Sequence, residues 1–316
     1  MSNESSQFNH IPVLLKGVLE YLTFPEDRPV RLIDGTLGGA GHTSALLEKY
    51  PLLEVLGIDR DDAALEASAK RLEKYGSRVK LCRGNYSECA DIAADNNWDS
   101  VDGVLLDIGV SSPQFDVADR GFSWRNSGPL DMRMDRRREI TAGRLLNRSS
   151  LDELTAIFRN YGEIKRARRL AEAVVEARKS VMFGTTDEFV KVCDEVLGRS
   201  KPGTLPAPTL AFQALRIAVN DELGELERGL SAAAGILNKG GRIAVISFHS
   251  LEDRMVKNYF RDESVSCICP ATLPVCCCNH KAALKVILKH PYTADEEELA
   301  ANSRSACAKL RVAEKL

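Results

Sequence analysis

The sequence predicts an α/β protein in which a parallel, doubly wound sheet is interrupted by a helical insertion. Between residues 30 and 109, short β-branched runs alternate with helix-like stretches, which is typical of a parallel sheet covered by helices on both faces. The alternation stops near Ser111 and resumes at Gly240, and the patterns between these points are mostly helical. We therefore expect a discontinuous sheet domain, residues 1–115 and 208–316, around a helical insertion at 116–207.

The strands follow from the apolar runs. Four are expected at residues 30–34, 53–59, 78–85 and 101–107, with helices at 43–50 and 62–75 between the first three. Gly241 begins the run GRIAVIS, which predicts a further buried strand, and residues 285–288 and 308–312 are expected to close the sheet.

The insertion is predicted to be helical from its caps and its periodicity. Capping-box patterns at Ser150 and at Thr185 mark two helix starts, and residues 163–180 carry apolar side chains at helical spacing. Residues 201–208, with three prolines and one glycine, predict a linker. Beyond it, the apolar residues from Phe212 to Leu230 predict one long helix, and a capping box at Ser250 predicts another.

Composition limits the class of protein. The chain has 316 residues, is 44% hydrophobic and 28% charged, and has a formal net charge of −2, so bulk positive charge cannot hold a nucleic acid. Any polyanion must therefore meet a local basic patch. No apolar run approaches a membrane span, and the segment from Met1 to His10 is polar, so we expect a cytoplasmic protein.

A glycine-rich loop and a strand-end acid predict a cofactor site. The run Asp34-Gly-Thr-Leu-Gly-Gly-Ala-Gly-His42 follows the first strand, and Asp59 ends the second, where a carboxylate can accept hydrogen bonds from ribose hydroxyls. The loop lacks both a dinucleotide fingerprint and the Lys-Ser/Thr of a phosphate-binding loop. These absences favour an adenosyl cofactor without a phosphate, of which S-adenosylmethionine is the usual one.

Other candidates have two interpretations each. Tyr86 could lie against the adenine or pack in the core, whereas Asp107, at the end of the fourth strand, is better explained by function because a buried carboxylate needs partners. His249 could orient the target or make a structural hydrogen bond at a helix start. Five of the nine cysteines fall between Cys267 and Cys278; their spacings differ from the usual zinc pattern, so we assign no metal.

Eight motifs in one order carry a family resemblance. They are His10-Ile-Pro-Val-Leu-Leu, Asp34-Gly-Thr, Leu106-Asp-Ile-Gly-Val-Ser-Ser-Pro-Gln114, Arg120-Gly-Phe-Ser, Gly128-Pro-Leu-Asp-Met-Arg-Met-Asp135, Phe212-Gln-Ala-Leu-Arg-Ile217, Ser247-Phe-His-Ser-Leu-Glu-Asp-Arg254 and Lys309-Leu-Arg311. On these motifs the chain resembles the RsmH (MraW) family, the ribosomal RNA small subunit methyltransferases H. The segments Pro206-Ala-Pro-Thr-Leu210 and Ser303-Arg-Ser-Ala-Cys307 depart from that family's pattern, and each change removes a basic group.

The resemblance implies a Rossmann-like, class I S-adenosylmethionine-dependent methyltransferase. It implies a 16S rRNA (cytosine(1402)-N(4))-methyltransferase, which methylates the exocyclic N4 of one cytidine in the decoding region of the small ribosomal subunit. We expect a direct in-line transfer without a covalent intermediate, because attack by an amine needs no protein nucleophile. By motif, the cofactor contacts are Ala40, Gly41, His42, Asp59, Tyr86, Asp107 and Gln114, and the catalytic candidates are Asp107 and His249.

The insertion is the basic part of the chain. Residues 116–212 hold 18 Lys and Arg against 14 Asp and Glu, a net charge of +4, which leaves −6 for the remainder. We expect this part to be an RNA recognition domain, although solvated helix faces would give the same pattern. The RNA-binding candidates are Arg133, Arg136, Arg137, Arg138, Arg166, Arg168 and Arg216.

Two other functions fit parts of the pattern. A dinucleotide-dependent oxidoreductase has a similar sheet, but the missing fingerprint disfavours it. A non-catalytic RNA-binding or assembly factor could keep the fold, but the cofactor positions are intact. The sequence does not distinguish a monomer from a homodimer.

Overall fold

The chain forms two compact units. A computed structural model describes residues 12–109, 115, 117–198, 206–267, 269, 273, 275 and 277–316. One unit, here the sheet unit, comprises Met1–Gly109 and Glu225–Leu316; the other, the helical unit, is Val110–Gly224. Among the described residues, no helix is long and apolar enough to cross a bilayer.

The sheet unit is built on one mixed sheet. Its strands lie in the order β3-β2-β1-β4-β5-β7-β6. Strands β1 to β5 are parallel, and β7 runs antiparallel to both β5 and β6. The strands are β1 (Val30–Asp34), β2 (Leu53–Asp59), β3 (Val79–Arg83), β4 (Val101–Asp107), β5 (Leu237–Ser247), β6 (Leu284–Val286) and β7 (Lys309–Lys315).

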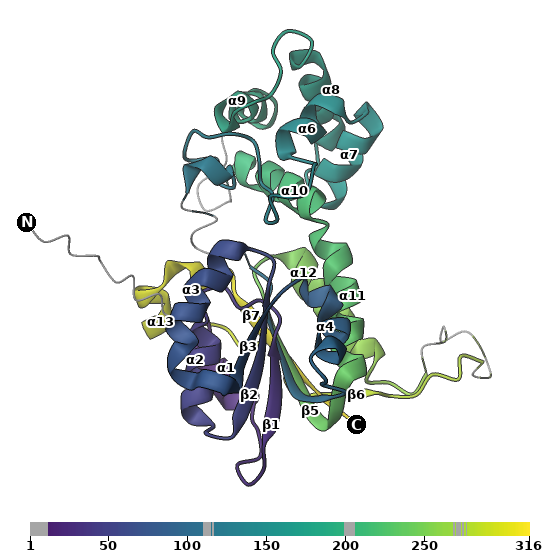
Figure 1. Cartoon of the computed structure of the whole chain (residues 1–316). Coiled ribbons are helices and arrows are strands. Elements are labelled where there is room, and N and C mark those ends of the chain that lie inside the picture. Colours follow the sequence, from purple (N-terminus) through teal and green to yellow (C-terminus); the bar gives the residue numbers. More distant parts are fainter. Residues whose placement is uncertain are drawn as a thin grey trace, which may run out of the picture. The chain divides into compact units, whose positions relative to one another are not determined.

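Helices cover both faces of this sheet (Figure 1). One face carries α1 (Leu15–Tyr21), α2 (Gly41–Lys49) and α3 (Asp62–Leu72), and the other carries α4 (Cys89–Asp95), α11 (Glu222–Ile236) and α12 (Ser250–Asp262). Each face has its own apolar core, because both sides of the parallel strands are apolar. The shorter elements are α13 (Glu296–Ala301), η1 (Glu73–Arg78), η2 (Tyr86–Glu88) and η4 (Ser303–Cys307).

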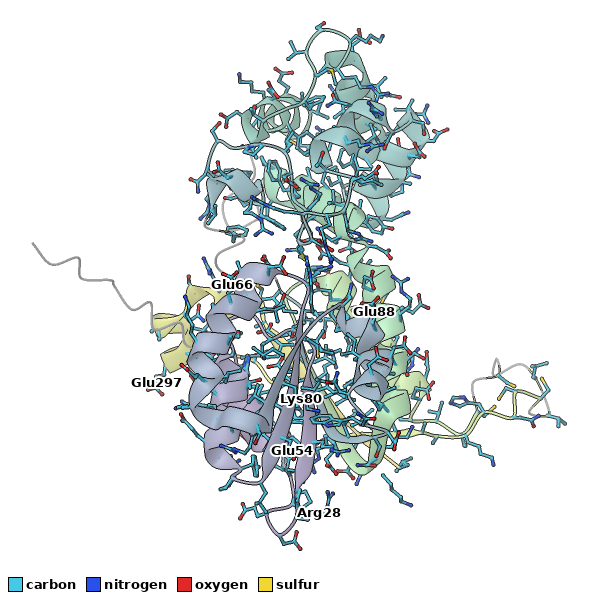
Figure 2. The ribbon with its side chains drawn as sticks, in the orientation of Figure 1. Arg28, Glu54, Glu66, Lys80, Glu88 and Glu297 are labelled. Carbon is cyan, nitrogen blue, oxygen red and sulfur yellow. The ribbon has the colours of Figure 1, made fainter. Side chains whose placement is uncertain are left out.

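Parallel strands bring three acidic residues to one edge. Asp34, Asp59 and Asp107 are the last residues of β1, β2 and β4, so all three lie at the carboxyl edge, where ligands of open α/β sheets bind. Figure 2 shows Arg28 at the opposite, amino edge of the sheet.

The helical unit packs around aromatic rings. Phe189 lies between Phe158, at 6.0 Å between ring centroids, and Phe212, at 5.6 Å. The predicted capping boxes at Ser150 and Thr185 do begin helices. The elements are η3 (Ala118–Arg120), α6 (Ala142–Arg148), α7 (Leu151–Asn160), α8 (Ala167–Ala177), α9 (Thr186–Leu197) and α10 (Ala207–Asn220).

Three local expectations need correction. The long helix predicted from Phe212 to Leu230 is two helices, because Asp221 adopts a left-handed conformation (φ 52°) between α10 and α11. α10 packs with α6, α7 and α9, so the helical unit extends to Gly224 rather than to residue 207. The cap of α12 is His249 with Glu252, one residue before the predicted box.

Candidate functional site

Asp34 connects the first strand to the glycine loop. Its Oδ2 accepts a hydrogen bond from Thr43 Oγ1 of α2 at 2.5 Å, and its Oδ1 accepts one from the Thr36 amide at 3.3 Å. Burial raises its pKa to about 6, against the lowering effect of the Thr43 hydrogen bond. The acid at the start of the loop therefore fixes the loop on the first turn of α2.

Asp59 holds the loop from the neighbouring strand. Its Oδ2 accepts from the Gly38 amide at 2.8 Å, and its Oδ1 from the Asp61 amide at 2.9 Å. Burial raises its pKa despite these two bonds. Since a carboxylate oxygen has two lone pairs, Asp59 keeps acceptor capacity for a ligand while it positions the loop.

At the start of α2, the backbone of Gly41 lies close to the side chain of Pro12. Ala40 caps the helix in a left-handed conformation (φ 56°), and a Cβ placed on Gly41 would lie 2.4 Å from Pro12 Cγ. His42 follows, buried, with Nε2 2.8 Å from the Val13 carbonyl oxygen. Because a carbonyl only accepts, Nε2 carries the hydrogen, and burial lowers the pKa of this imidazole.

Asp107 lies beside these groups. Its amide donates to Thr36 Oγ1 at 2.5 Å, and its Oδ2 is 3.9 Å from His42 Nδ1. Burial raises its pKa to about 7, while a hydrogen bond from the Gly109 amide lowers it and the charge of Glu252 raises it. The carboxyl group of Asp107 therefore changes its charge near neutral pH.

Asn85 is a candidate that the sequence analysis did not select. Asn85 forms a capping box with Glu88 at the start of η2: its buried Oδ1 faces the Glu88 amide, and the Glu88 carboxylate accepts from the Asn85 amide at 2.9 Å. It follows β3, at the same edge as the three acids. The usable signal was a polar residue directly after a strand of a parallel sheet.

Tyr86 and His249 make structural contacts. Tyr86 is 7% exposed and belongs to an apolar core cluster; its ring fills space that a Cβ on Gly229 would occupy. His249 Nδ1 accepts from the Glu252 amide at 3.4 Å, and its Nε2 lies 3.0 Å from Glu252 Oε1. These are the structural alternatives that the sequence left open. Gln114 lies outside the described residues.

The family model described as the MraW methylase family matches residues 7–316. The chain belongs to this family. Three relatives are each named ribosomal RNA small subunit methyltransferase H. That of Heliobacterium modesticaldum is 46% identical over 313 residues (98% of this chain, 99% of the relative), that of Nitratidesulfovibrio vulgaris (strain Miyazaki F) 48% over 313 residues (97% and 86%), and that of Geobacter sulfurreducens 46% over 315 residues (98% and 99%).

The match confirms the family inferred from the eight motifs. The seven-stranded sheet, with β7 antiparallel at its β5 side, likewise confirms the expected Rossmann-like class I methyltransferase fold. Solved structures are more distant: a methyltransferase homolog protein from Pyrococcus horikoshii aligns with a TM-score of 0.40 at 11% identity, over 92% of this chain and 63% of that chain, which adds nothing to the assignment.

The arginines that the sequence predicts for RNA binding in this MraW methylase divide into two groups. Those of the first group donate several hydrogen bonds to neighbouring carboxylates and carbonyls. Arg133 donates to both Asp131 oxygens, at 2.6 and 2.9 Å, and also to two backbone carbonyls. Arg216 donates to both oxygens of the buried Glu222 at 2.8 Å. Both are predicted to bind RNA, and that prediction stays a prediction; in this structure their donors bond within the helical unit.

Polar side chains of α10 also bond to the segment that carries Arg133. Asn220 accepts from the Met134 amide and donates to the Met132 carbonyl, each at 2.8 Å, so α10 holds the segment that carries Arg133. Gln213 on the same helix donates to the Tyr161 carbonyl at 3.1 Å. These polar side chains of α10 therefore hold neighbouring segments of the helical unit.

The second group of arginines is exposed. Arg137 pairs with Asp135 at 2.8 Å and Arg168 with Glu172 at 3.0 Å, yet both side chains are more than 60% exposed. The other exposed arginines of the predicted set are Arg136, Arg138 and Arg166.

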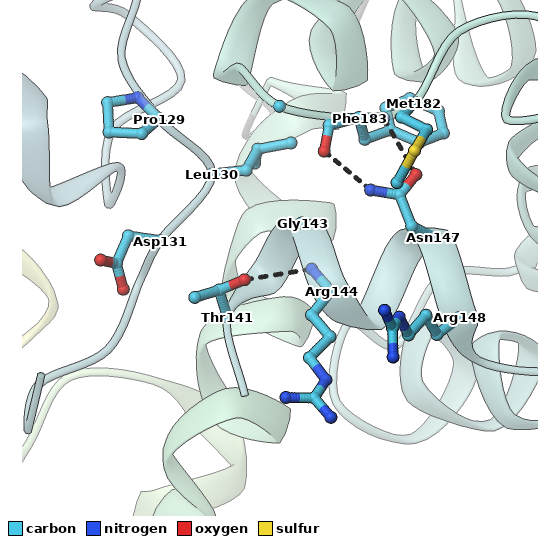
Figure 3. Close-up of a pocket in the computed structure, with 11 residues that line it drawn as sticks. Pro129, Leu130, Asp131, Thr141, Gly143, Arg144, Asn147, Arg148, Met182 and Phe183 are labelled. Carbon is cyan, nitrogen blue, oxygen red and sulfur yellow. Dashed lines mark hydrogen bonds between the residues drawn. The ribbon is translucent and has the colours of Figure 1, made fainter. Parts of the chain in front are cut away.

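A hollow of about 500 Å³ lies near the start of α6 (Figure 3). Arg144 and Arg148 line it on one side, and Met182 and Phe183 on another; Asn147 donates to the Phe183 carbonyl at 2.8 Å and fixes that wall. Met182 is 69% exposed. Two cationic side chains beside apolar ones suit a nucleotide, whose phosphate and base need different partners.

Proposed function

We propose that this MraW methylase transfers a methyl group from S-adenosylmethionine to the exocyclic N4 of one cytidine, position 1402, in the decoding region of 16S rRNA. The observation that carries the proposal is Asp107, a carboxyl group at the ligand edge of the sheet whose pKa is raised to about 7. The names of the relatives, and the family motifs around Asp107, support this substrate. A cytoplasmic location accords with a small ribosomal subunit partner.

The residues at the carboxyl edge fit the cofactor. Asn85 Oδ1 is a buried acceptor whose contact in the described chain is the cap of η2, and its further lone pair suits the amino group of an adenine. Asp59 has remaining lone pairs for ribose hydroxyls, and the backbone from Gly38 to His42 passes close enough for amide contacts. When bound, S-adenosylmethionine supplies a methyl group on a sulfonium, whose sulfur keeps the electron pair of the broken bond.

Asp107 is the residue that we assign to the amine. The lone pair of a cytosine amine is delocalised into the ring, so an acceptor on its hydrogen increases the electron density on nitrogen. The nitrogen gains a methyl group and loses one proton, and a carboxylate with a pKa near 7 can accept that proton. Neutral His42, held by Val13, stays beside Asp107 without adding a charge. The transfer is direct and in line, with no covalent intermediate on the chain.

The helical unit is assigned to RNA recognition. It carries 19 Lys and Arg against 16 Asp and Glu, whereas the sheet unit carries 24 against 29, so the two have net charges of +3 and −5. The exposed arginines, together with Arg144 and Arg148, suit phosphates flanking the target, while a paired or stacked base must leave the stack to present its amine.

Nucleoside analysis of the RNA tests the substrate. Small subunits or their naked RNA, from cells lacking this activity, would be incubated with the full chain and cofactor, then mapped by mass and by chromatography against an N4-methylcytidine standard. One methyl group on one cytidine of the decoding region is expected. Methyl on another base, on C5 or on a ribose would overturn the proposal, as would no methylation of either substrate.

Matched charge removals test the RNA surface. Removing Arg136 and Arg148 together should weaken RNA binding several-fold and reduce the magnitude of its salt slope by about 1 to 2. Removing Lys80 and Lys239, two exposed residues of the sheet unit, removes the same charge and should leave both quantities unchanged. Equal losses from both pairs would refute the assignment of the helical unit to RNA.

A further inference from the structure

Five cysteines lie in the segment 264–283, of which the structure describes four. The segment 264–283 joins α12 to β6, and its described residues form no helix or strand. Its ends are held together, because the Ala283 and Leu284 amides donate to the Glu263 carbonyl at 2.8 and 3.0 Å.

Apolar packing does not hold the segment. Val265, Leu273 and Val275 are 38%, 47% and 75% exposed, so they form no core. Ordering each residue of a chain costs about 1 to 2 kcal/mol of backbone entropy, and small segments without a core are usually stabilised by disulfides or a metal.

The sulfur atoms have the spacing of ligands around one ion. The Sγ atoms of Cys267, Cys269 and Cys278 all lie within 4.8 Å of one another. Cys267 and Cys278 are 3.8 Å apart, and Cys269 and Cys277 are 3.9 Å apart. A tetrahedral zinc with Zn–S bonds of about 2.3 Å has sulfur–sulfur edges of about 3.8 Å, whereas a disulfide is about 2.05 Å long.

We propose that Cys267, Cys269, Cys277 and Cys278 bind one Zn²⁺ ion. Three sulfur donors lie within 4.8 Å of one another, and Cys277 lies 3.9 Å from Cys269 as the fourth. Sulfur-only donors favour Zn²⁺ over Mg²⁺ or Ca²⁺, which prefer oxygen. Binding deprotonates the four thiols, and the ion offsets the charge of the thiolates. Sequence spacing alone predicts no metal here, because the Cys-x-Cys and Cys-Cys pairs are unlike the usual zinc pattern. The fold of the segment supplies the geometry instead. Cys276 lies outside the described residues.

The zinc site would order the segment and would take no part in methyl transfer. It follows α12 and precedes β6, whereas the acids proposed for chemistry end β1, β2 and β4. The inference is therefore independent of the proposed function, and its test needs no RNA.

Metal content and cobalt spectroscopy test the site on the full chain. Chain purified under reducing conditions with Zn²⁺ should retain about one zinc per molecule by mass spectrometry, and Co²⁺ added to the stripped chain should give thiolate charge-transfer and tetrahedral d–d absorption, saturating at about one equivalent. Replacing Cys267 and Cys278 with Ser should remove both signals. Cys277→Ser should weaken zinc retention at least about tenfold and change the cobalt spectrum.

The control is Cys307→Ser, which removes an exposed cysteine outside the segment and should keep the full zinc content and spectrum. Circular dichroism checks that each variant folds. The proposal is overturned if the reduced wild-type chain binds no stoichiometric zinc, if the double variant keeps the cobalt spectrum, or if peptide mapping finds Cys267–Cys278 and Cys269–Cys277 disulfides in chain that takes up no metal after reduction.

Discussion

Strand β4 carries an aspartate near each end, and the two have opposite surroundings. Asp102, at the amino edge, accepts from Arg28 Nη2 at 2.6 Å and from the Arg31 amide at 2.9 Å. Burial alone would raise its pKa, but these partners lower it below the usual value. Asp107, five residues later, has a pKa of about 7 because burial dominates.

This difference separates an acid stabilised as an anion from the acid that we propose for the chemistry. A buried carboxylate paired with a guanidinium is stabilised as an anion, so Asp102 contributes to folding in its charged form. The charged form of Asp107 is disfavoured, which lowers the stability of the folded chain and leaves the group ready to accept a proton. One strand thus carries a stabilising acid at its amino end and, at its carboxyl end, the acid that we propose as proton acceptor.

The largest effect is expected at the carboxyl end of β4. Asp107→Asn keeps the size of the side chain but removes the proton acceptor, so methyl transfer should fall by about 100-fold or more. Cofactor affinity should change little, and the free energy of unfolding at neutral pH should rise relative to wild type because no buried charge remains at this position. Single-turnover transfer of labelled methyl, with calorimetric cofactor titration as the control, measures this. An unchanged transfer rate would show that Asp107 does not receive the proton.

A smaller effect is expected at the end of β2. Asp59→Ala removes the acceptor of the Gly38 amide and the proposed ribose acceptor, so cofactor binding should weaken by about 1.5 to 3 kcal/mol, or about 10- to 150-fold. Asp62→Ala, which removes an acid 63% exposed next to the same strand, is the control. Equal cofactor affinity for both variants by calorimetry would contradict this role.

At the amino edge the expected loss is in stability. Asp102→Ala leaves the Arg31 amide without its acceptor and removes the Arg28 pair, so the free energy of unfolding should fall by about 1 to 3 kcal/mol. Methyl transfer by the folded variant should match wild type. Urea unfolding measures the first quantity. Loss of activity without loss of stability would reverse the distinction between the two edges.

The pH dependence of stability sharpens the same contrast. Asp107 binds its proton more tightly in the folded chain, with a pKa of about 7 against an ordinary 3.8, so its contribution lowers stability as pH rises from about 4 to about 7. Asp34, with a pKa of about 6, adds to this decline. Relative to wild type, Asp107→Asn should therefore gain stability up to about pH 7 and then stay level. The raised pKa would be contradicted if the free energies of unfolding of the two proteins, measured with urea, changed with pH in parallel.

Several features were predictable because local sequence decides them. The strand ends Asp34, Asp59 and Asp107 follow from apolar runs bounded by acids, and parallel strands bring their carboxyl ends together whatever the side chains. Two of the predicted caps also formed, since a capping box involves residues only three apart. The break at Asp221 was missed because apolar spacing continues across it, and a single left-handed residue leaves no trace in that pattern.

The sequence by itself determined the sheet, its ligand edge, the family and the basic character of the insertion, because periodicity, motif and charge are properties of the chain alone. Only the tertiary structure decided which charged groups are available. The sequence does not show that Arg133 and Arg216 pair with Asp131 and Glu222, whereas the structure places these acids beside them. The same holds for the cysteines, whose grouping around one point depends on distances between sulfur atoms that sequence spacing does not fix.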